Sequence, residues 1–251
     1  KEIYEISQLL CSMGISKSDV AEIYNPERFT SKANLFGLRP GFAVDLMVSK
    51  NSKGDHWDLS KDTDQRELRR LLKKEKPLFL VGSPPCGPFS PLQNLSKYKR
   101  TDEENQQILE EGRMHLKVAV DCYLEQHNHG RFFLHEHPKP SASWQEPEIE
   151  RLASLPGVYK VESPMCKWEM VAEDQQGVGY VRKDTCWLTN SPEMAKCIEG
   201  KCEGGHRHVH LINGRARAAQ TYPPKLVSAI LNGIRRELRV RGELSALAEL
   251  T

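Results

Sequence analysis

The sequence has no hydrophobic run long enough to cross a membrane. A transmembrane helix needs about 20 predominantly apolar residues, and the longest apolar runs here are far shorter. No secretory signal peptide is visible at the start, and no internal repeat or low-complexity segment occurs. The net charge is only +2, so total charge does not identify a nucleic-acid-binding protein. These absences, with 38% hydrophobic and 28% charged residues, predict a soluble globular protein with no membrane partner.

A disulfide framework is also missing. The seven cysteines are odd in number and mostly scattered, whereas a small secreted domain carries an even set that pairs. The pattern therefore predicts an intracellular, reducing compartment, the cytoplasm or the nucleus. A length of 251 residues allows one large domain with short appendages. We expect an N-terminal helix at 1–18, one domain at 19–240 and a C-terminal tail at 241–251.

Strand and helix patterns alternate along the chain. Short apolar runs predict strands at 19–24, 41–46, 78–81 and 131–136, and near 157–162 and 180–189. Amphipathic patterns predict helices at 27–36, 62–74, 101–126, 146–155 and 225–238. The helix at 101–126 starts with a capping box, Thr101-Asp102-Glu103-Glu104. This alternation predicts an α/β fold with a doubly wound, mostly parallel sheet in a single domain.

Two of the predicted strands end in reactive side chains. Cys86 follows the strand at 78–81 on a loop that Pro84 and Pro85 stiffen, and Glu136 ends a later strand. Because parallel strands end at the same edge of a sheet, we expect the thiol and the carboxyl to face one pocket. A thiol beside a proton donor suits nucleophilic catalysis. A proline-rich turn around a buried structural thiol is the alternative interpretation.

One enzyme class that combines cysteine and glutamate is excluded by spacing. Zinc nucleobase deaminases carry His-x-Glu and Pro-Cys-x-x-Cys. Here His135 is adjacent to Glu136, and position 89 is Phe89 rather than cysteine.

Four further segments share one motif order. Residues 82–90 read Gly-Ser-Pro-Pro-Cys-Gly-Pro-Phe-Ser, residues 133–138 contain Glu136, residues 215–217 read Arg-Ala-Arg, and residues 220–224 read Gln-Thr-Tyr-Pro-Pro. In this order they resemble the nucleophile loop, the Glu-Asn-Val motif, the Arg-x-Arg strand and the Gly-Asn-x-Val-Pro-Pro segment of cytosine carbon-5 DNA methyltransferases. A stretch at 181–190 is similar to a Lys-x-Thr-x-x-Trp-x-Asn segment of phage- and mobile-element-borne relatives.

The resemblance spans residues 19–238 and implies a Rossmann-like fold of the class I S-adenosylmethionine-dependent type, with a methyltransferase-like domain at 19–240. It implies that a cytosine, most simply in DNA, is flipped out and methylated at carbon 5. The catalytic residues that it implies are Cys86, Glu136, Arg215 and Arg217. The S-adenosylmethionine contacts that it implies are Tyr24, Asn25, Asp45, Leu46, Asp58, Leu59, Ser83, Pro84, Gln220 and Tyr222.

Two features differ from the family. The loop at 25–28 is Asn-Pro-Glu-Arg, whereas the family has a glycine-rich loop that lets the backbone approach the cofactor. Only two residues separate Arg217 from Gln220, where the family carries a long target-recognition region. A non-catalytic nucleic-acid-binding module that has lost its cofactor therefore stays an alternative. A methyltransferase of another base position is a second alternative, although Cys86 stands where exocyclic-amine methyltransferases need an aromatic residue.

A cysteine- and histidine-rich segment lies at 197–210. Cys197, Cys202, His206 and His208 are predicted zinc ligands, because thiolate and imidazole are good ligands for zinc. The alternating histidines are equally typical of the polar face of a strand. From Lys201 to Arg241 there are nine Lys or Arg and two Glu, an excess of seven that predicts either phosphate contacts or a solvated surface.

Overall fold

The computed structural model describes residues 16–47, 49–91, 93, 97–212, 215 and 218–242. Most of the helix predicted at 1–18, the tail from 243 onward and the predicted catalytic residue Arg217 lie outside these residues.

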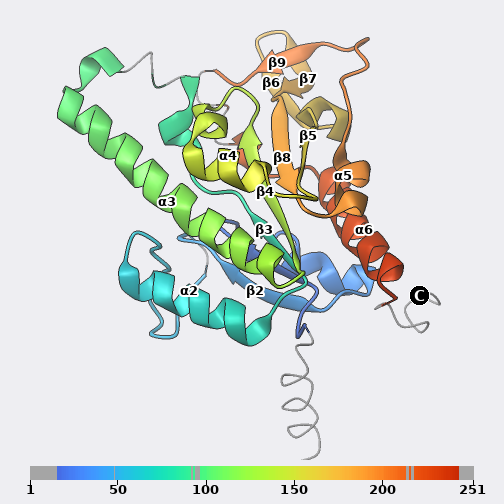
Figure 1. Ribbon diagram of the computed structural model, residues 1–251. Helices are drawn as coiled ribbons and strands as arrows, with labels where there is room; N and C mark the ends of the chain where they lie inside the picture. Colours follow the sequence, from blue (N-terminus) through green and yellow to red (C-terminus); the bar gives the residue numbers. More distant parts are fainter. Residues whose placement is uncertain are drawn as a thin grey trace, which may run out of the picture.

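Six strands form the central sheet (Figure 1). They are β1 (Val20–Ile23), β2 (Pro40–Val44), β3 (Phe79–Gly82), β4 (Phe132–Pro138), β5 (Tyr159–Glu162) and β8 (Thr185–Thr189). The strand order is β2-β1-β3-β4-β8-β5. The first four strands in this order are parallel, whereas β8 is antiparallel to both of its neighbours. The predicted α/β class and single domain are confirmed, with a mixed sheet.

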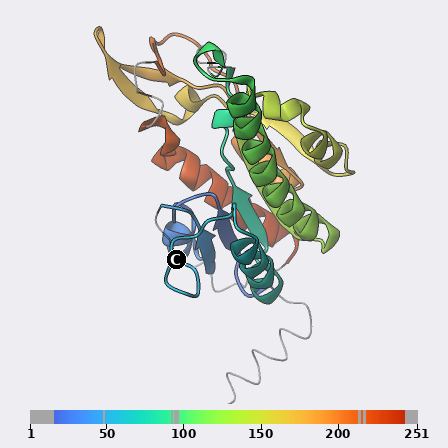
Figure 2. The same cartoon turned by 90° about the vertical axis from the view of Figure 1, so that its left-hand side faces the viewer.

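Helices cover both faces of this sheet (Figures 1 and 2). The α-helices are α2 (Asp62–Glu75), α3 (Asp102–Asn128), α4 (Pro147–Ala153), α5 (Pro192–Ile198) and α6 (Pro224–Val240). The 3-10 helices are η1 (Thr30–Phe36), η2 (Gly87–Phe89), η4 (Lys97–Lys99), η5 (Ala142–Gln145), η6 (Met165–Trp168) and η7 (Ala218–Gln220). Side chains of α2, α3 and α4 form one apolar core on one face, and those of η1, α5 and α6 form another on the opposite face. No helix in the described part of the chain is both long and apolar enough to cross a membrane.

Local sequence signals explain several of these elements. The predicted capping box is present at the start of α3, where the Thr101 side chain accepts a bond from Glu104 N and the Glu104 side chain accepts one from Thr101 N. This arrangement pairs two amides that the first helical turn leaves free. The predicted helix at 27–36 is confirmed in its second half as the 3-10 helix η1. It ends at Gly37, whose φ of 65° lies in the left-handed region that favours glycine.

A smaller sheet corrects one predicted strand. It consists of β6 (Val171–Asp174), β7 (Gly177–Arg182) and β9 (His208–His210), in the order β6-β7-β9. In Figure 2 its hairpin projects at the top of the molecule. The single strand predicted at 180–189 is therefore wrong, because the chain passes from one sheet to the other between β7 and β8. The charged run Arg182-Lys183-Asp184 separates the two strands in the sequence, and burial changes from partly exposed in β7 to fully buried in β8.

The strand order creates a reversal point. From β1 the chain crosses to β2 on one side, and from β2 it crosses back to β3 on the other side of β1. Ligands of open α/β sheets bind outside the carboxyl ends of the strands at such a point. The residues after β1, β2 and β3 therefore lie where a ligand is expected, as do most of the predicted site residues.

Candidate functional site

Cys86 lies on the loop after β3, directly before η2. The Cys86 carbonyl accepts a hydrogen bond from Phe89 N at 3.1 Å, and this bond closes a turn that begins at Cys86. The fully buried His137 holds the loop from β4, because its Nε2 lies 2.9 Å from the Pro84 carbonyl oxygen. Its Nδ1 lies 2.5 Å from Ser143 Oγ. Burial lowers the pKa of His137, so the ring is neutral: Nε2 donates to the carbonyl and Nδ1 accepts from the hydroxyl. The ring thus fixes the backbone two residues before Cys86.

Glu136 and Lys183 form a nearly buried ion pair beside Cys86. Consecutive strand residues point to opposite faces of a sheet, so Glu136 faces away from His137. Its Oε1 lies 3.4 Å from Lys183 Nζ, and the two side chains are 7% and 16% exposed. This oxygen has no hydrogen-bond partner among the described residues. Lys183 also donates to the Ala219 carbonyl at 3.4 Å. The oxygen therefore has a cation beside it but makes no hydrogen bond, so Glu136 is suited to accept a hydrogen bond from a ligand.

The two charges act on the thiol in opposite directions. Burial and the negative charge of Glu136 raise the pKa of Cys86, and the positive charge of Lys183 lowers it. The net direction is upward, so the thiol is protonated at neutral pH in the free protein. A nucleophilic role therefore requires that Cys86 lose its proton only when a substrate is bound.

This balance makes a testable prediction about thiol reactivity. Glu136→Gln should move the pH midpoint of Cys86 alkylation by iodoacetamide to lower pH, because a neighbouring carboxylate disfavours the thiolate. Alkylation rates are measured from pH 6 to pH 11 by peptide mass spectrometry, with the range chosen around the ordinary thiol pKa of about 8.5. Glu162→Gln, at an exposed carboxylate paired with Lys139, is the matched control and should leave the Cys86 profile unchanged. An unchanged midpoint in Glu136→Gln would mean that this carboxylate does not act on the thiol.

Three predicted cofactor contacts meet across the reversal point. Ser83 Oγ lies 2.7 Å from the hydroxyl of Tyr222, whose ring is buried. The guanidinium of Arg28 lies 4.9 Å from the centroid of that ring and donates to the Gln220 carbonyl. Burial and the charge of Glu136 raise the pKa of Tyr222, and Lys183 Nζ lies 5.9 Å from the centroid of the Tyr222 ring. The loop after β1 and the segment before α6 are thus joined, and Arg28 is a contact that the sequence did not identify.

The glycine-free loop after β1 is held by a buried carboxylate. Glu22, on β1, accepts bonds from Phe29 N at 2.8 Å, from Thr30 N at 2.7 Å and from Thr30 Oγ1 at 2.8 Å, with a longer one from Arg28 N at 3.3 Å. Burial raises the pKa of Glu22 to about 7, and these hydrogen bonds oppose the rise. The amides at the start of η1 therefore point back to the strand, and this closure explains how the loop forms without glycine.

Tyr24 and Asn25 directly follow β1, and their side chains have different surroundings. Tyr24 has a φ of 56°, in the left-handed region, and its hydroxyl lies 3.2 Å from His115 Nδ1 on α3. Asn25 is 2% exposed, and its Nδ2 has no hydrogen-bond partner among the described residues. A buried amide donor without a partner at a reversal point is suited to bind a ligand.

Asp45 and Asp58, the acids predicted to bind the nucleoside part of the cofactor, differ in how far their carboxylate oxygens are already bonded within the protein. Asp45 follows β2 and accepts a bond from Met47 N through Oδ1 at 2.9 Å. No bond to its Oδ2 occurs among the described residues, and the neighbouring Leu46 and Met47 are 58% and 72% exposed. Asp58, in contrast, accepts bonds from Ser60 and pairs with Lys61 at 3.1 Å. The predicted contact Leu59 is a core residue, 5% exposed.

The predicted catalytic arginine Arg215 contacts the smaller sheet. It donates to the Glu173 carbonyl at 2.8 Å and to the Ile212 carbonyl at 3.2 Å. Neither Cys86 nor Glu136 is among its hydrogen-bond partners in the described part of the chain. Lys183, which the sequence analysis did not select, is the cation that pairs with Glu136. Its position in the Lys-x-Thr-x-x-Trp-x-Asn stretch was the available signal.

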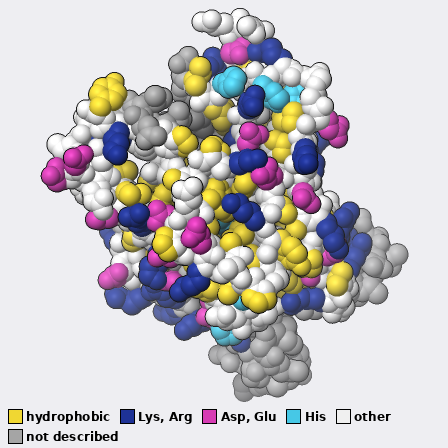
Figure 3. Space-filling model, turned by 45° about the horizontal axis from the view of Figure 1, so that its top comes forward, with side chains coloured by type: hydrophobic (Ala, Val, Ile, Leu, Met, Phe, Trp, Pro, Cys, Tyr) yellow, Lys and Arg dark blue, Asp and Glu magenta, His cyan; other side chains and the backbone are white. Residues whose placement is uncertain are grey.

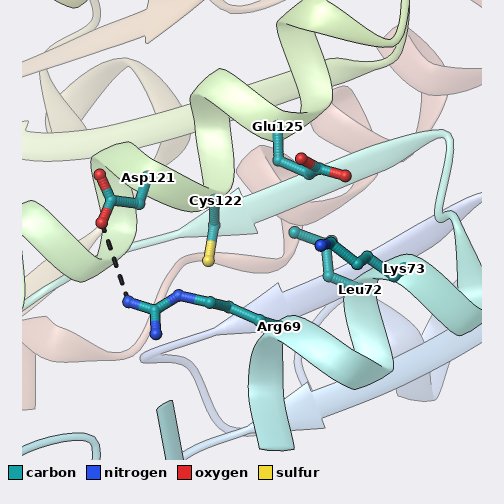
Figure 4. Close-up of a pocket in the computed structure, with 6 residues that line it drawn as sticks. All are labelled: Arg69, Leu72, Lys73, Asp121, Cys122 and Glu125. Carbon is teal, nitrogen blue, oxygen red and sulfur yellow. Dashed lines mark ion pairs between the residues drawn. The ribbon is translucent and has the colours of Figure 1, made fainter. Parts of the chain in front are cut away.

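Two cavities lie near these elements. One of about 450 Å³ lies between the smaller sheet and the start of α6, and it is lined by residues that include Arg215, Ala219 and Tyr222. The other, of about 240 Å³, lies between α2 and α3 (Figure 4). Its charged lining residues include Arg69 and Asp121, which are 3.9 Å apart. The latter half of α2 leads to the amino end of β3, so this second cavity is at the edge of the sheet opposite to Cys86.

The predicted zinc ligands are corrected at one position. Cys202, His206 and His208 lie together, but the fourth member of the group is Cys166 on η6. Cys197 lies on α5, half-buried against the core, and does not belong to the group. Cys197 packs against the core instead, so closeness in sequence was misleading.

No protein-family model matches this chain, and no curated protein sequence matches it.

Proposed function

We propose that the protein is a DNA cytosine-5 methyltransferase-like enzyme, which transfers a methyl group from S-adenosylmethionine to carbon 5 of a flipped cytosine. The observation that carries the proposal is the position of Cys86 and Glu136. Cys86 lies on the loop after β3, Glu136 lies near the carboxyl end of the neighbouring parallel strand β4, and Lys183 lies beside both. A thiol, a carboxyl and an ammonium group in one buried corner suit nucleophilic addition to a ring that must be protonated as it is attacked.

The raised pKa of Cys86 defines the proton path in this proposal. The thiol proton passes to the Glu136 carboxylate, and Glu136 then gives it to the ring nitrogen of cytosine as the sulfur bonds to carbon 6. One S–H bond is broken, one S–C and one N–H bond are formed, and the charge of Glu136 is restored. The buried Oε1 of Glu136 has the free acceptor capacity that this exchange requires. The ammonium group of Lys183 lies 3.4 Å from this oxygen and faces the negative charge of the carboxylate.

The residues around the reversal point fit the nucleoside half of S-adenosylmethionine, which supplies the methyl group when bound. Asp45 offers a carboxylate oxygen for ribose hydroxyls, beside the exposed apolar side chains of Leu46 and Met47. Asn25 offers a buried amide donor. At the methionine half, Arg28 replaces glycine backbone, and a guanidinium suits a carboxylate. The strand-order reversal between β1 and β3 supports the Rossmann-like fold that the resemblance implies.

The proposed partner is DNA. Lys and Arg are interspersed with Asp and Glu over the face shown in Figure 3 and do not form a single patch. The basic segment 201–241 is divided, because Arg241 lies 4.2 Å from the Phe132 ring at the amino end of β4. Phosphate contacts are therefore proposed for the part of this segment before α6, on the side of the sheet edge where Cys86 lies.

One observation favours a second candidate, a non-catalytic nucleic-acid-binding module. The amides after β1 bond to Glu22, so they are not directed toward a ligand as a glycine-rich loop would be. Loss of cofactor binding with retention of the fold would produce this arrangement.

Calorimetric titration with S-adenosylmethionine distinguishes the two candidates. We expect the wild-type protein to bind, and Asp45→Ala to weaken binding at least tenfold, about 1.4 kcal/mol, because the ribose contact is lost. Asp55→Ala, at an exposed loop acid, is the matched control and should bind as the wild type does. Folded wild-type protein that releases no detectable heat would contradict the catalytic proposal and support the binding module.

A further inference from the structure

We propose that Cys166, Cys202, His206 and His208 bind one structural zinc ion. One ligand atom from each residue lies within 4.8 Å of all the others. Cys202 Sγ lies 3.5 Å from His206 Nε2 and 3.6 Å from His208 Nε2, and the two Nε2 atoms are 3.0 Å apart. Two sulfurs and two imidazole nitrogens are a set of donors that structural zinc sites commonly use.

The distances among Cys202, His206 and His208 fit a tetrahedral ion. Zinc bonds of about 2.3 Å to sulfur and about 2.05 Å to nitrogen, at tetrahedral angles, separate S and N by about 3.6 Å and two N atoms by about 3.3 Å. Both S–N distances agree with this geometry, and the N–N distance is slightly shorter.

The local chain conformation brings three of the ligands together. Gly204 and Gly205 have φ of 76° and 71°, in the left-handed region that favours glycine, and they turn the chain between Cys202 and His206. His208 begins β9 two residues after His206, and this spacing places both rings on the same side of an extended chain. The ring of Tyr180 on β7 packs against that of His206, with 4.6 Å between their centroids.

The fourth ligand joins this segment to a distant part of the chain. Cys166 is 5% exposed and lies on η6, which precedes β6. The neighbouring Met165 N donates to the Lys183 carbonyl at 2.9 Å. An ion at this position therefore links the loop before β9 to η6 and, through η6, to the backbone of Lys183.

Four protein ligands leave no open position for water or a substrate, so the role of the ion is structural. The smaller sheet needs such a link because it buries few side chains. In β6 none of the four residues is fully buried, and in β7 and β9 only Val181 and Val209 are. A three-stranded sheet with so little apolar burial is marginal by itself.

Metal analysis of the purified wild-type protein is the first test. Protein produced with zinc in the medium should contain about one zinc per chain. Cys166→Ser and Cys202→Ser should each lose most of it. Cys197→Ser is the matched control, because this thiol lies nearby in the sequence but outside the group, and it should keep the metal. Wild-type zinc of less than about half an equivalent, or loss in Cys197→Ser with retention in Cys166→Ser, would overturn the proposal.

Cobalt substitution and melting give two readouts that do not depend on activity. The cobalt-loaded protein should show the intense absorption of a tetrahedral ion together with thiolate charge-transfer bands, and Cys202→Ser, which should lose most of the metal, should lose most of these bands. Chelation of zinc should lower the Tm by more than about 5 °C, because the ion binds only the folded state. An octahedral cobalt spectrum, or an unchanged Tm after complete zinc removal, would contradict a structural tetrahedral site.

Discussion

Cys86→Ser should abolish the covalent adduct that the wild-type protein forms with DNA containing 5-fluorocytosine in the presence of S-adenosylmethionine. The sulfur must stay bonded to the ring until a proton leaves carbon 5, and fluorine at that position cannot leave as a proton. Serine is nearly isosteric with cysteine, but its hydroxyl is a far weaker nucleophile, so we expect the adduct to fall by at least about 1,000-fold. The adduct is measured by denaturing gel electrophoresis and by intact mass.

Two further variants separate nucleophile from proton donor. Glu136→Gln should still form the adduct, because Cys86 remains. The rate should fall by at least about 100-fold, because general acid assistance is lost. Cys197→Ser changes a thiol outside the site and should react as the wild type does. If the wild-type protein binds both DNA and cofactor yet forms no adduct across a pool of random sequences, Cys86 is not the nucleophile.

The sequence predicted those parts of the site that local patterns determine. The runs around Val20 and Phe79 are short, apolar and followed by turn residues, so the strands and their carboxyl ends could be predicted. Cys86 could be placed on the loop after one strand, and Glu136 near the carboxyl end of the next strand, from these runs alone. Their placement at one edge then depends only on β3 and β4 being parallel neighbours, which the alternation of strands and helices indicates.

Contacts between distant segments could not be predicted in the same way. Cys166 belongs to the proposed metal site and lies on η6, a short helix that no periodic pattern in the sequence predicts. Cys197 was predicted instead because it lies close to Cys202 in the sequence. Lys183 reaches Glu136 only because the chain passes between two sheets at that point. For both Cys166 and Lys183, the contact depends on which distant segment of the chain packs beside the residue, and a local sequence pattern does not contain that information.

The structure explains how the loop after β1 forms without glycine. The missing glycine indicated a loop unable to approach a ligand. In the structure, Glu22 gathers the amides of Phe29 and Thr30, and Arg28 extends over Tyr222 instead. A guanidinium group therefore lies in a loop that lacks glycine, and a guanidinium suits an anionic group.

Gly82→Ala should destabilise the protein by about 3 kcal/mol, the upper part of the range for overpacking a core. An added Cβ would lie 2.1 Å from the Tyr123 hydroxyl oxygen and 2.9 Å from Ile23 Cγ1. Tyr123 cannot move aside easily, because its fully buried ring stacks on Phe133 at 5.0 Å and its hydroxyl lies 3.4 Å from His135 Nδ1. The free energy of unfolding is measured by urea denaturation.

The rescue variant identifies the cause of this destabilisation. Tyr123→Phe removes the oxygen that the new methyl group meets first, so Gly82→Ala/Tyr123→Phe should be more stable than Gly82→Ala alone, although Tyr123→Phe by itself loses the contact with His135. Rescue should be partial, because Ile23 Cγ1 remains at 2.9 Å. Gly82 directly precedes the loop that carries Cys86, so Gly82→Ala should also slow adduct formation under conditions in which the variant is still folded. A double variant no more stable than Gly82→Ala would show that the Tyr123 hydroxyl is not what excludes a side chain at this position.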